Sequence, residues 1–191
     1  VHTAHYYTGM VDEKMQRGYV VLEDLSDCMQ GDAELGCSPT QLMEIAGALG
    51  TLHATFWGLS TVQTVDSPLQ SWRPTAMSCS QRTAKYARFL GRHGHLLTTE
   101  QRTLVTQLEA ELQPALERLL RQPETLIHCD FHLENMVFKG PMETIPIILD
   151  WQTVARGPGV VDVARGLVEC MPTEMRRAEQ SRIITRYTDT L

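Results

Sequence analysis

The chain has 191 residues, 42% of them hydrophobic and 21% charged, as is typical of one soluble globular domain. A formal charge of −6 argues against a nucleic-acid or anionic-membrane partner, because such partners bind net basic surfaces. Five cysteines without a CxxC pair argue against a disulfide framework or a structural zinc site, and favour a reducing, cytoplasmic compartment. The sequence has no apolar run of about 18 residues, so we expect no membrane span.

The first predicted element is a strand near the N-terminus. The apolar run Gly18–Leu22 is typical of a buried strand, and the acidic residues directly after it end the run. Residues 26–37 contain two glycines and are predicted to form a loop. Because the sequence starts with Val1 in the middle of a pattern, we expect the chain to be a fragment of a longer protein.

A helix is predicted to follow this loop. Ser38 can cap the helix, Pro39 suits its first turn, and Gln41 stands where a capping box requires a glutamine. Seven further residues then fall on one helical face: Leu42, Ile45, Ala46, Leu49, Leu52, His53 and Phe56. Gly58 is the expected end of this helix.

The middle of the chain is predicted to form a loop and two helices. Residues 59–80 contain two prolines and are expected to form the loop. A helix is expected over residues 81–90, ending at the glycine that follows. Thr98 or Thr99 is the expected cap of the next helix, which Pro114 should kink or interrupt.

From residue 125 onward the pattern changes to short strands. Three apolar runs predict them: Thr125–Ile127, Met136–Phe138 and Ile145–Leu149. A Lys-Gly-Pro break between the second and third runs favours a hairpin. Helices are expected over Asp162–Cys170 and from Pro172 onward. The predicted fold class is therefore α+β, mainly helical, with a small β-hairpin region.

The hairpin region carries a dense polar cluster, within the stretch IHCDFHLENMVF. His128, Asp130 and Asn135 have the spacing H-x-D-x-x-x-x-N, and Asp150 ends the third predicted strand. Asn135 and Asp150 offer the hard oxygen ligands that suit Mg²⁺. Asp130 could accept a proton from a hydroxyl nucleophile. Together these groups are the set that phosphoryl transfer needs.

This arrangement resembles the catalytic and metal-binding loops of the protein-kinase-like fold. The closest resemblance is to the aminoglycoside phosphotransferase and choline kinase-like group of small-molecule kinases, including its ecdysteroid-kinase-like branch. His132 stands where Ser/Thr protein kinases carry a lysine, and Asp150 is followed by Trp-Gln rather than Phe-Gly. Residues 49–57, LGTLHATFW, resemble the "LHA-x-FW" helix of the group, and residues 162–164, DVA, its "D-L-A" stretch.

The resemblance implies an ATP-dependent transfer of the γ-phosphoryl group to a hydroxyl of a small-molecule acceptor. Asp130 would be the catalytic base, and Asn135 and Asp150 would hold Mg²⁺. His128 would brace the catalytic loop, and His132 would approach the transferred phosphoryl group.

The resemblance also implies an adenine site and a lobe division. Backbone groups of Glu23 and Leu25 would meet adenine, and Asp162 would brace the catalytic loop from beneath. Residues 1–25 would be a remnant of the N-terminal lobe with its hinge strand, and residues 26–191 the helical C-terminal lobe. Because most of the nucleotide lobe is missing from the pattern, this chain alone is expected to bind ATP poorly.

Simpler interpretations exist for several of these residues. His128 and Asp130 flank Cys129, whose side chain should point away from both, so a buried structural thiol is favoured over a nucleophile. A zinc pair of His128 with His132 is disfavoured by the flanking strands. His53 has the pattern of a core histidine, Asp162 could be a helix N-cap, and Trp151 is expected to pack rather than to stack on substrate.

Two questions of function stay open in the sequence. A rival function is a catalytically incompetent, pseudokinase-like module that binds a partner. The acceptor is not specified: the negative charge suits a cationic aminoglycoside or amino alcohol, and the apolar content suits a steroid or lipid-like alcohol equally well. A protein kinase is disfavoured, because no activation segment of useful length and no Ala-Pro-Glu stretch follows Asp150.

Overall fold

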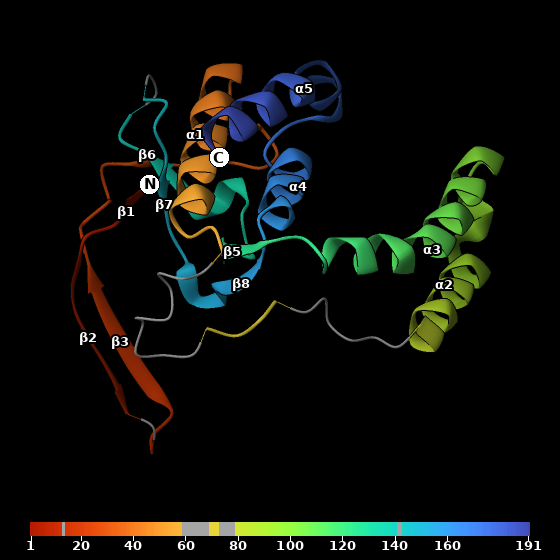
Figure 1. Cartoon of the computed structure of the whole chain (residues 1–191), viewed down its shortest axis with the longest axis horizontal. Coiled ribbons are helices and arrows are strands. Elements are labelled where there is room, and N and C mark those ends of the chain that lie inside the picture. Colours follow the sequence, from red (N-terminus) through yellow and green to blue (C-terminus); the bar gives the residue numbers. More distant parts are fainter. Residues whose placement is uncertain (13, 59–68, 73–78, 141–142) are drawn as a thin grey trace. The chain divides into compact units, whose positions relative to one another are not determined.

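The structure, a computed structural model, describes residues 1–12, 14–58, 69–72, 79–140 and 143–191 (Figure 1). The chain divides into two compact units, one formed by Val1–Gln70 with Glu124–Leu191 and the other by Ser71–Pro123. This division into units does not test the lobe boundary that the sequence predicts after residue 25, so that boundary stays a prediction.

The first unit contains a small mixed sheet in the strand order β1-β7-β6-β4. Its strands are β1 (His2–Thr3), β4 (Met29–Gln30), β6 (Met136–Phe138) and β7 (Ile147–Ile148). β6 and β7 are antiparallel, with Met136 opposite Ile148, so the expected hairpin is confirmed. β1 runs parallel to β7, and β4 runs antiparallel to β6. β4 lies within residues 26–37, which were predicted to form a loop.

A second strand pair leads into the polar cluster. β5 (Glu124–Ile127) is antiparallel to β8 (Ala155–Pro158), with Ile127 opposite Ala155. The expected strand over residues 125–127 is therefore confirmed. Ile127 is fully buried, and β5 thus fixes the start of the segment that follows it.

The third strand pair is a hairpin of β2 (Tyr6–Asp12) and β3 (Arg17–Leu22). The predicted strand is confirmed, but its predicted burial is wrong. Tyr19 is 53% exposed and Val20 62% exposed. The reason is that β3 pairs with β2 alone and, in the described part of the chain, the core lies elsewhere.

Three helices complete the first unit: α1 (Pro39–Thr55), α4 (Val160–Glu169) and α5 (Thr173–Thr190). α1 begins as predicted, because the Ser38 hydroxyl accepts from the Gln41 N–H and the Gln41 side chain accepts from the Ser38 N–H. The helix ends at Thr55, and Gly58 follows with a φ of +73°. Figure 1 shows α4 and α5, in blue, beside the orange α1.

The core of this unit lies where these helices meet the β6–β7 hairpin. Its buried residues include Leu49 of α1, Met136 and Ile148 of the sheet, and Ile183 of α5. α1 and α5 approach so closely that a Cβ on Gly50 would lie 2.7 Å from the backbone oxygen of Tyr187. Close packing of this kind holds the core elements in one arrangement.

The second unit is helical. Its elements are α2 (Cys79–His93), the short 3-10 helix η2 (Gly94–Leu96) and α3 (Thr99–Leu119). Thr98 caps α3 with a second capping box, as predicted. α2 runs past Gly91, where an end was predicted. α3 continues through Pro114 to Leu119, so the helix is not interrupted there.

The loop predicted over residues 59–80 lies mostly outside the described residues. Within the described part of the chain, no helix is both long enough and apolar enough to cross a membrane.

Candidate active site

The candidate catalytic loop, residues 128–135, connects β5 to β6 and is held from below by Asp162. The Asp162 carboxylate is fully buried and accepts hydrogen bonds from the N–H of His128 at 2.7 Å and of Cys129 at 2.9 Å. Cys129 has a φ of +68°, an uncommon conformation for a residue with a side chain. Asp162 therefore braces the loop, as the resemblance implied, while Gly159 rather than Asp162 is the N-cap of α4.

Behind Asp162 lies a buried chain of polar groups. Nε2 of His53 is 3.4 Å from Oδ2 of Asp162, and Nδ1 of His53 is 2.9 Å from the Tyr187 hydroxyl. Burial, together with the Asp162 carboxylate, raises the pKa of Tyr187 to about 12. The hydroxyl therefore stays protonated and can donate to Nδ1. His53 is a fully buried, hydrogen-bonded core histidine, as its pattern predicted.

His128 links the catalytic loop to the strand that ends at Asp150. Its Nε2 lies 2.8 Å from the Leu149 carbonyl, and its Nδ1 lies 3.3 Å from the N–H of Asp130. The Asp130 N–H can only donate, so Nδ1 is the acceptor and Nε2 carries the proton. The ring is buried and meets the Trp151 ring edge-on, at a centroid distance of 4.8 Å. Trp151 therefore packs against His128 as predicted, while the expectation that it does not stack on substrate stays a prediction.

Asp130, His132 and Asn135 lie together at the open side of the loop. The side-chain N–H₂ of Asn135 donates to the Asp130 carbonyl at 2.9 Å and to Asp130 Oδ2 at 3.1 Å. Nε2 of His132 lies 3.4 Å from the same Oδ2, and its Nδ1 lies 3.3 Å from a carboxylate oxygen of Glu134. The Asp130 side chain is 28% exposed, so an acceptor can reach it.

Arg165 contacts the other oxygen of Asp130, and the sequence analysis missed it. One guanidinium nitrogen lies 2.8 Å from Asp130 Oδ1. Burial raises the pKa of Asp130, but Arg165, Asn135 and His132 lower it by more, so the pKa lies below its ordinary range. The available signal was the spacing of Asp162 and Arg165, which puts both on one helix face.

Cys129 is not poised to act as a nucleophile. Burial raises the pKa of its thiol to about 11, and the Asp162 carboxylate raises it further than Arg165 lowers it. A thiol with such a pKa is almost entirely protonated at neutral pH, whereas the thiolate is the nucleophile. The side chain is partly rather than fully buried, which corrects the expectation of a buried thiol.

Asp150 is brought to the catalytic loop by the backbone. The N–H of Leu149 donates to the carbonyl of Asn135 at 2.8 Å, so the two predicted metal ligands lie on adjacent, paired segments. Asp150 has a φ of +59° and starts the 3-10 helix η4 (Trp151–Thr153). Its carboxylate accepts a hydrogen bond from the Gln152 side chain at 3.2 Å.

The donor set fits Mg²⁺. A carboxylate and an amide oxygen are hard ligands, and Mg²⁺ takes few protein ligands beside phosphate and water. The Asn135 amide nitrogen is turned to Asp130, so its oxygen remains for a metal ion. Among the described residues, no group of three or more His, Cys, Asp or Glu side chains could hold a metal ion.

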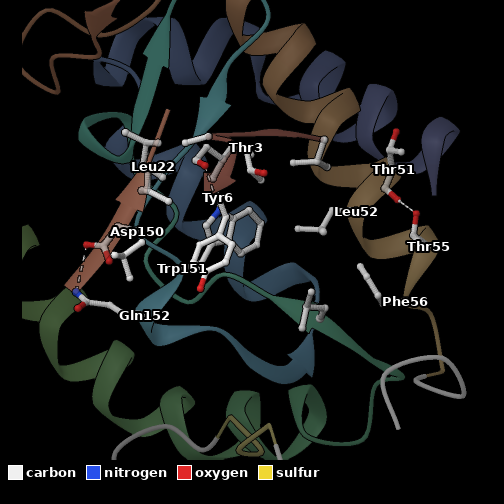
Figure 2. A pocket seen from close by; sticks show the side chains of 16 residues that line it. Thr3, Tyr6, Leu22, Thr51, Leu52, Thr55, Phe56, Asp150, Trp151 and Gln152 are labelled. Atoms are coloured by element: carbon white, nitrogen blue, oxygen red, sulfur yellow. Dashed lines mark hydrogen bonds between the residues drawn. The ribbon is translucent and has the colours of Figure 1, made fainter. Parts of the chain in front are cut away.

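Asp150 also borders an open cavity of about 820 Å³ (Figure 2). Its lining is mostly apolar and includes Tyr6, Leu22, Leu52, Phe56 and Trp151. Leu22 ends β3, directly before the two predicted adenine-binding residues. Glu23 and Leu25 are not among the residues that line this cavity, and their role stays a prediction.

Comparison with known families decides the relationship. Residues 24–189 match the family model described as "Phosphotransferase enzyme family", abbreviated APH. The chain belongs to this phosphotransferase family. The matched range covers the catalytic loop, Asp150 and α4, and so confirms the resemblance stated from the sequence.

Solved structures of small-molecule kinases share the fold. Choline kinase LicA from Streptococcus pneumoniae is similar over 97% of this chain and 56% of its own, with 13% identity and a TM-score of 0.53. Amicoumacin kinase hAmiN, solved with AMP-PNP, Ca²⁺ and Ami, is similar over 100% of this chain and 57% of its own, with 15% identity and a TM-score of 0.62. An ethanolamine kinase from Plasmodium vivax is similar over 99% and 54%, with 16% identity and a TM-score of 0.58.

These similar structures show the fold of the chain and how much of a whole kinase it spans. The predicted protein-kinase-like, α+β fold is confirmed. The chain spans little more than half the length of these solved kinases, between 54% and 57% of each. No curated protein matches its sequence.

Proposed function

We propose that this phosphotransferase-family chain is the acceptor- and metal-binding part of an ATP-dependent small-molecule kinase. Its reaction would move the γ-phosphoryl group of ATP to a hydroxyl. The hydroxyl oxygen bonds to the γ-phosphorus, the bond from that phosphorus to the bridging oxygen breaks, and ADP leaves. Family membership supports phosphoryl transfer, and the nucleotide analogue AMP-PNP and Ca²⁺ in the similar amicoumacin kinase support nucleotide and divalent-metal use.

The observation that supports this proposal is the hydrogen bond between the Asn135 and Asp130 side chains, together with the backbone bond from Leu149 to Asn135. Asp130 and Asn135 lie on the loop, and Asp150 follows the segment that pairs with Asn135. Asp130 accepts the proton of the acceptor hydroxyl, or orients that hydroxyl. This division of roles is the one that in-line phosphoryl transfer requires.

Asn135 and Asp150 are the proposed metal ligands. When bound, Mg²⁺ neutralises charge on the phosphates. The chain itself supplies the amide oxygen of Asn135, whose orientation is fixed by the hydrogen bonds of Asn135 to Asp130. It also supplies the carboxylate of Asp150, whose backbone follows the Leu149–Asn135 bond.

The two histidines support the loop in different ways. His128 ties the loop to the Leu149 carbonyl and is a positioning residue in this proposal. His132 is 15% exposed and lies beside Asp130 and Asn135. From this position it would approach the transferred phosphoryl group.

The hinge after β3 is the proposed adenine contact. The Glu23 N–H already donates to the His5 carbonyl at 2.8 Å, and the Leu25 carbonyl accepts from the Cys28 N–H at 2.9 Å. The groups that remain for adenine in the described chain are the Glu23 carbonyl and the Leu25 N–H. One acceptor and one donor match the amino group and ring nitrogen of adenine.

The first acceptors to test are amino alcohols and aminoglycosides. Two of the similar structures are a choline kinase and an ethanolamine kinase, and a −6 chain suits a cationic acceptor. Steroid or lipid-like alcohols are the second group. The acceptor-pocket residues, expected within 50–120 and the C-terminal tail, lie partly outside the described residues.

Calorimetry of Mg·ATP binding by the full-length protein and by this chain tests the proposal. Asp150→Asn is the informative variant, because asparagine tolerates the left-handed backbone of this position while the charge is lost. The matched control is Asp189→Asn, the same change at an exposed position of α5.

We expect the full-length protein to bind Mg·ATP, Asp150→Asn to weaken binding at least about tenfold, and Asp189→Asn to leave it unchanged. This chain alone should bind more weakly than the full-length protein. If the full-length protein does not bind nucleotide at all, phosphoryl transfer is wrong and the binding-module alternative takes its place.

A further inference from the structure

Arg165 grips the catalytic loop at two points. Its Nη1 lies 3.4 Å from the backbone carbonyl of Cys129, and its Nη2 lies 2.8 Å from Oδ1 of Asp130. One turn earlier on the same helix face, Asp162 accepts the N–H of Cys129. α4 thus holds both the N–H and the carbonyl of one loop residue, and then the side chain of the next.

The Arg165 guanidinium also contacts a carboxylate of its own helix. Its Nε lies 3.4 Å from a carboxylate oxygen of Glu169, four residues further along α4. This contact is an ion pair without hydrogen-bond geometry, and among the described residues Nε has no hydrogen-bond partner. The side chain of Arg165 is 36% exposed, so the cluster sits at the surface beside the open side of the loop.

An aspartate needs such a partner if its carboxylate is to hold one direction. The terminal torsion of Asp is broad, so packing alone leaves the plane of the carboxylate poorly fixed. Arg165 takes Oδ1, and Asn135 and His132 face Oδ2. With Oδ1 held on one side, the direction of Oδ2 toward an incoming hydroxyl is defined.

We propose that Arg165 is a positioning residue that sets the direction of the Asp130 carboxylate for acceptor activation. This inference rests on the proposed role of Asp130. The forked guanidinium is essential to it, because one flat group reaches the Cys129 carbonyl and the Asp130 carboxylate together. A lysine ammonium is a single point charge and cannot reproduce that geometry.

Three variants of the full-length protein test this role: Arg165→Met, Arg165→Lys and the control Arg182→Met. Arg182 is 66% exposed on α5 and pairs only locally with Glu179. The measurements are Mg·ATP binding by calorimetry and ATP turnover to water. Both Arg165 variants should bind Mg·ATP within about twofold of the parent but turn it over about 10- to 100-fold more slowly. Arg182→Met should match the parent in both.

Chemical rescue separates positioning from a merely structural role. A fourth variant, Arg165→Ala, should be as slow as Arg165→Met. A low, non-denaturing concentration of guanidinium should raise its turnover, and should leave that of the parent and of Arg182→Met unchanged. Parent-like turnover in Arg165→Met would overturn the inference. So would a slow Arg165→Ala that guanidinium does not help.

Hydrogen exchange keeps the test independent of nucleotide. Without ligand, amides 128–135 should exchange about tenfold faster in Arg165→Met than in the parent, because a charged hydrogen-bond clamp is lost. Unchanged exchange would overturn the inference even in a protein that binds no ATP. Absence of Mg·ATP binding by the parent, by contrast, would count against the proposed function alone.

Discussion

Two hairpins of the first unit carry similar apolar sequences in opposite surroundings. Val137 in β6 is 7% exposed, whereas Val20 in β3 is 62% exposed. β6 and β7 lie against α1, α4 and α5 through the shared core, whereas β2 and β3 pair, among the strands that the structure describes, only with each other. An apolar strand therefore indicates a face suited to a core, while its actual burial depends on which elements pack against it.

The difference matters for function because the candidate catalytic loop is held by the buried hairpin and the helices packed against it. The catalytic loop is tied to α4 through Asp162 and to β7 through His128. The exposed hairpin contributes the strand that leads to Glu23, and its Tyr6 and Leu22 line the cavity beside Asp150. Preorganised polar groups need a rigid support, and in this chain the buried hairpin and its helices provide it.

The largest expected effect is at the buried brace of the catalytic loop, and it is measured by making the same substitution in a buried and an exposed aspartate. Asp162→Asn should lower the free energy of unfolding by about 3 kcal/mol, because the amide cannot accept both loop N–H groups from a buried position. Asp150→Asn should change it by no more than about 0.5 kcal/mol, since that carboxylate has one exposed partner. Urea unfolding of the two variants measures both values, and equal losses would contradict the contrast.

A second test compares two valines. Val137→Ala should lower the free energy of unfolding by about 2 kcal/mol, through lost burial and the cavity left behind. Val20→Ala should cost about 0.5 kcal/mol or less, because that side chain is already exposed. The same denaturation series gives both numbers. A large loss at Val20 would mean that the hairpin is covered in solution.

A third and smaller effect concerns pH. Burial raises the pKa of Cys37 and of Cys170 to about 12, whereas an unfolded cysteine has a pKa of about 8.5. Above about pH 8.5 the folded state therefore holds more protons than the unfolded state. Stability is fully present below about pH 8.5 and is lost as pH rises toward 12, on the order of 1 kcal/mol per thiol by pH 9. Unfolding at pH 7 and pH 9 measures this, and Cys37→Ala should show the smaller loss.

Much of this architecture is readable in the sequence because local chemistry decides it. The capping box at Ser38 and the cap at Thr98 were both predicted, and the structure contains both and adds a capping box at Thr98. The Lys-Gly-Pro break after β6 predicted the hairpin that puts the segments of Asn135 and Asp150 side by side, because a hairpin joins strands that are close in the sequence. The brace at Asp162 followed from family resemblance and is present in the hydrogen bonds.

The rest depends on contacts between distant segments. Arg165 is an ordinary helix arginine until the loop carrying Asp130 is placed against α4. The Tyr187 hydroxyl behind His53 is equally invisible, because 134 residues separate the pair. The exposure of Val20 was mispredicted for the same reason, because an apolar run does not state what covers it.

The most direct test of the account is the effect of Asp130→Asn on binding and turnover in the full-length protein. The account predicts Mg·ATP binding within about twofold of the parent, because Asn135 and Asp150 remain, and turnover at least about 100-fold slower, because the group that receives or orients the acceptor proton is lost. Turnover within about threefold of the parent would contradict the assignment of Asp130, and with it the proposed site.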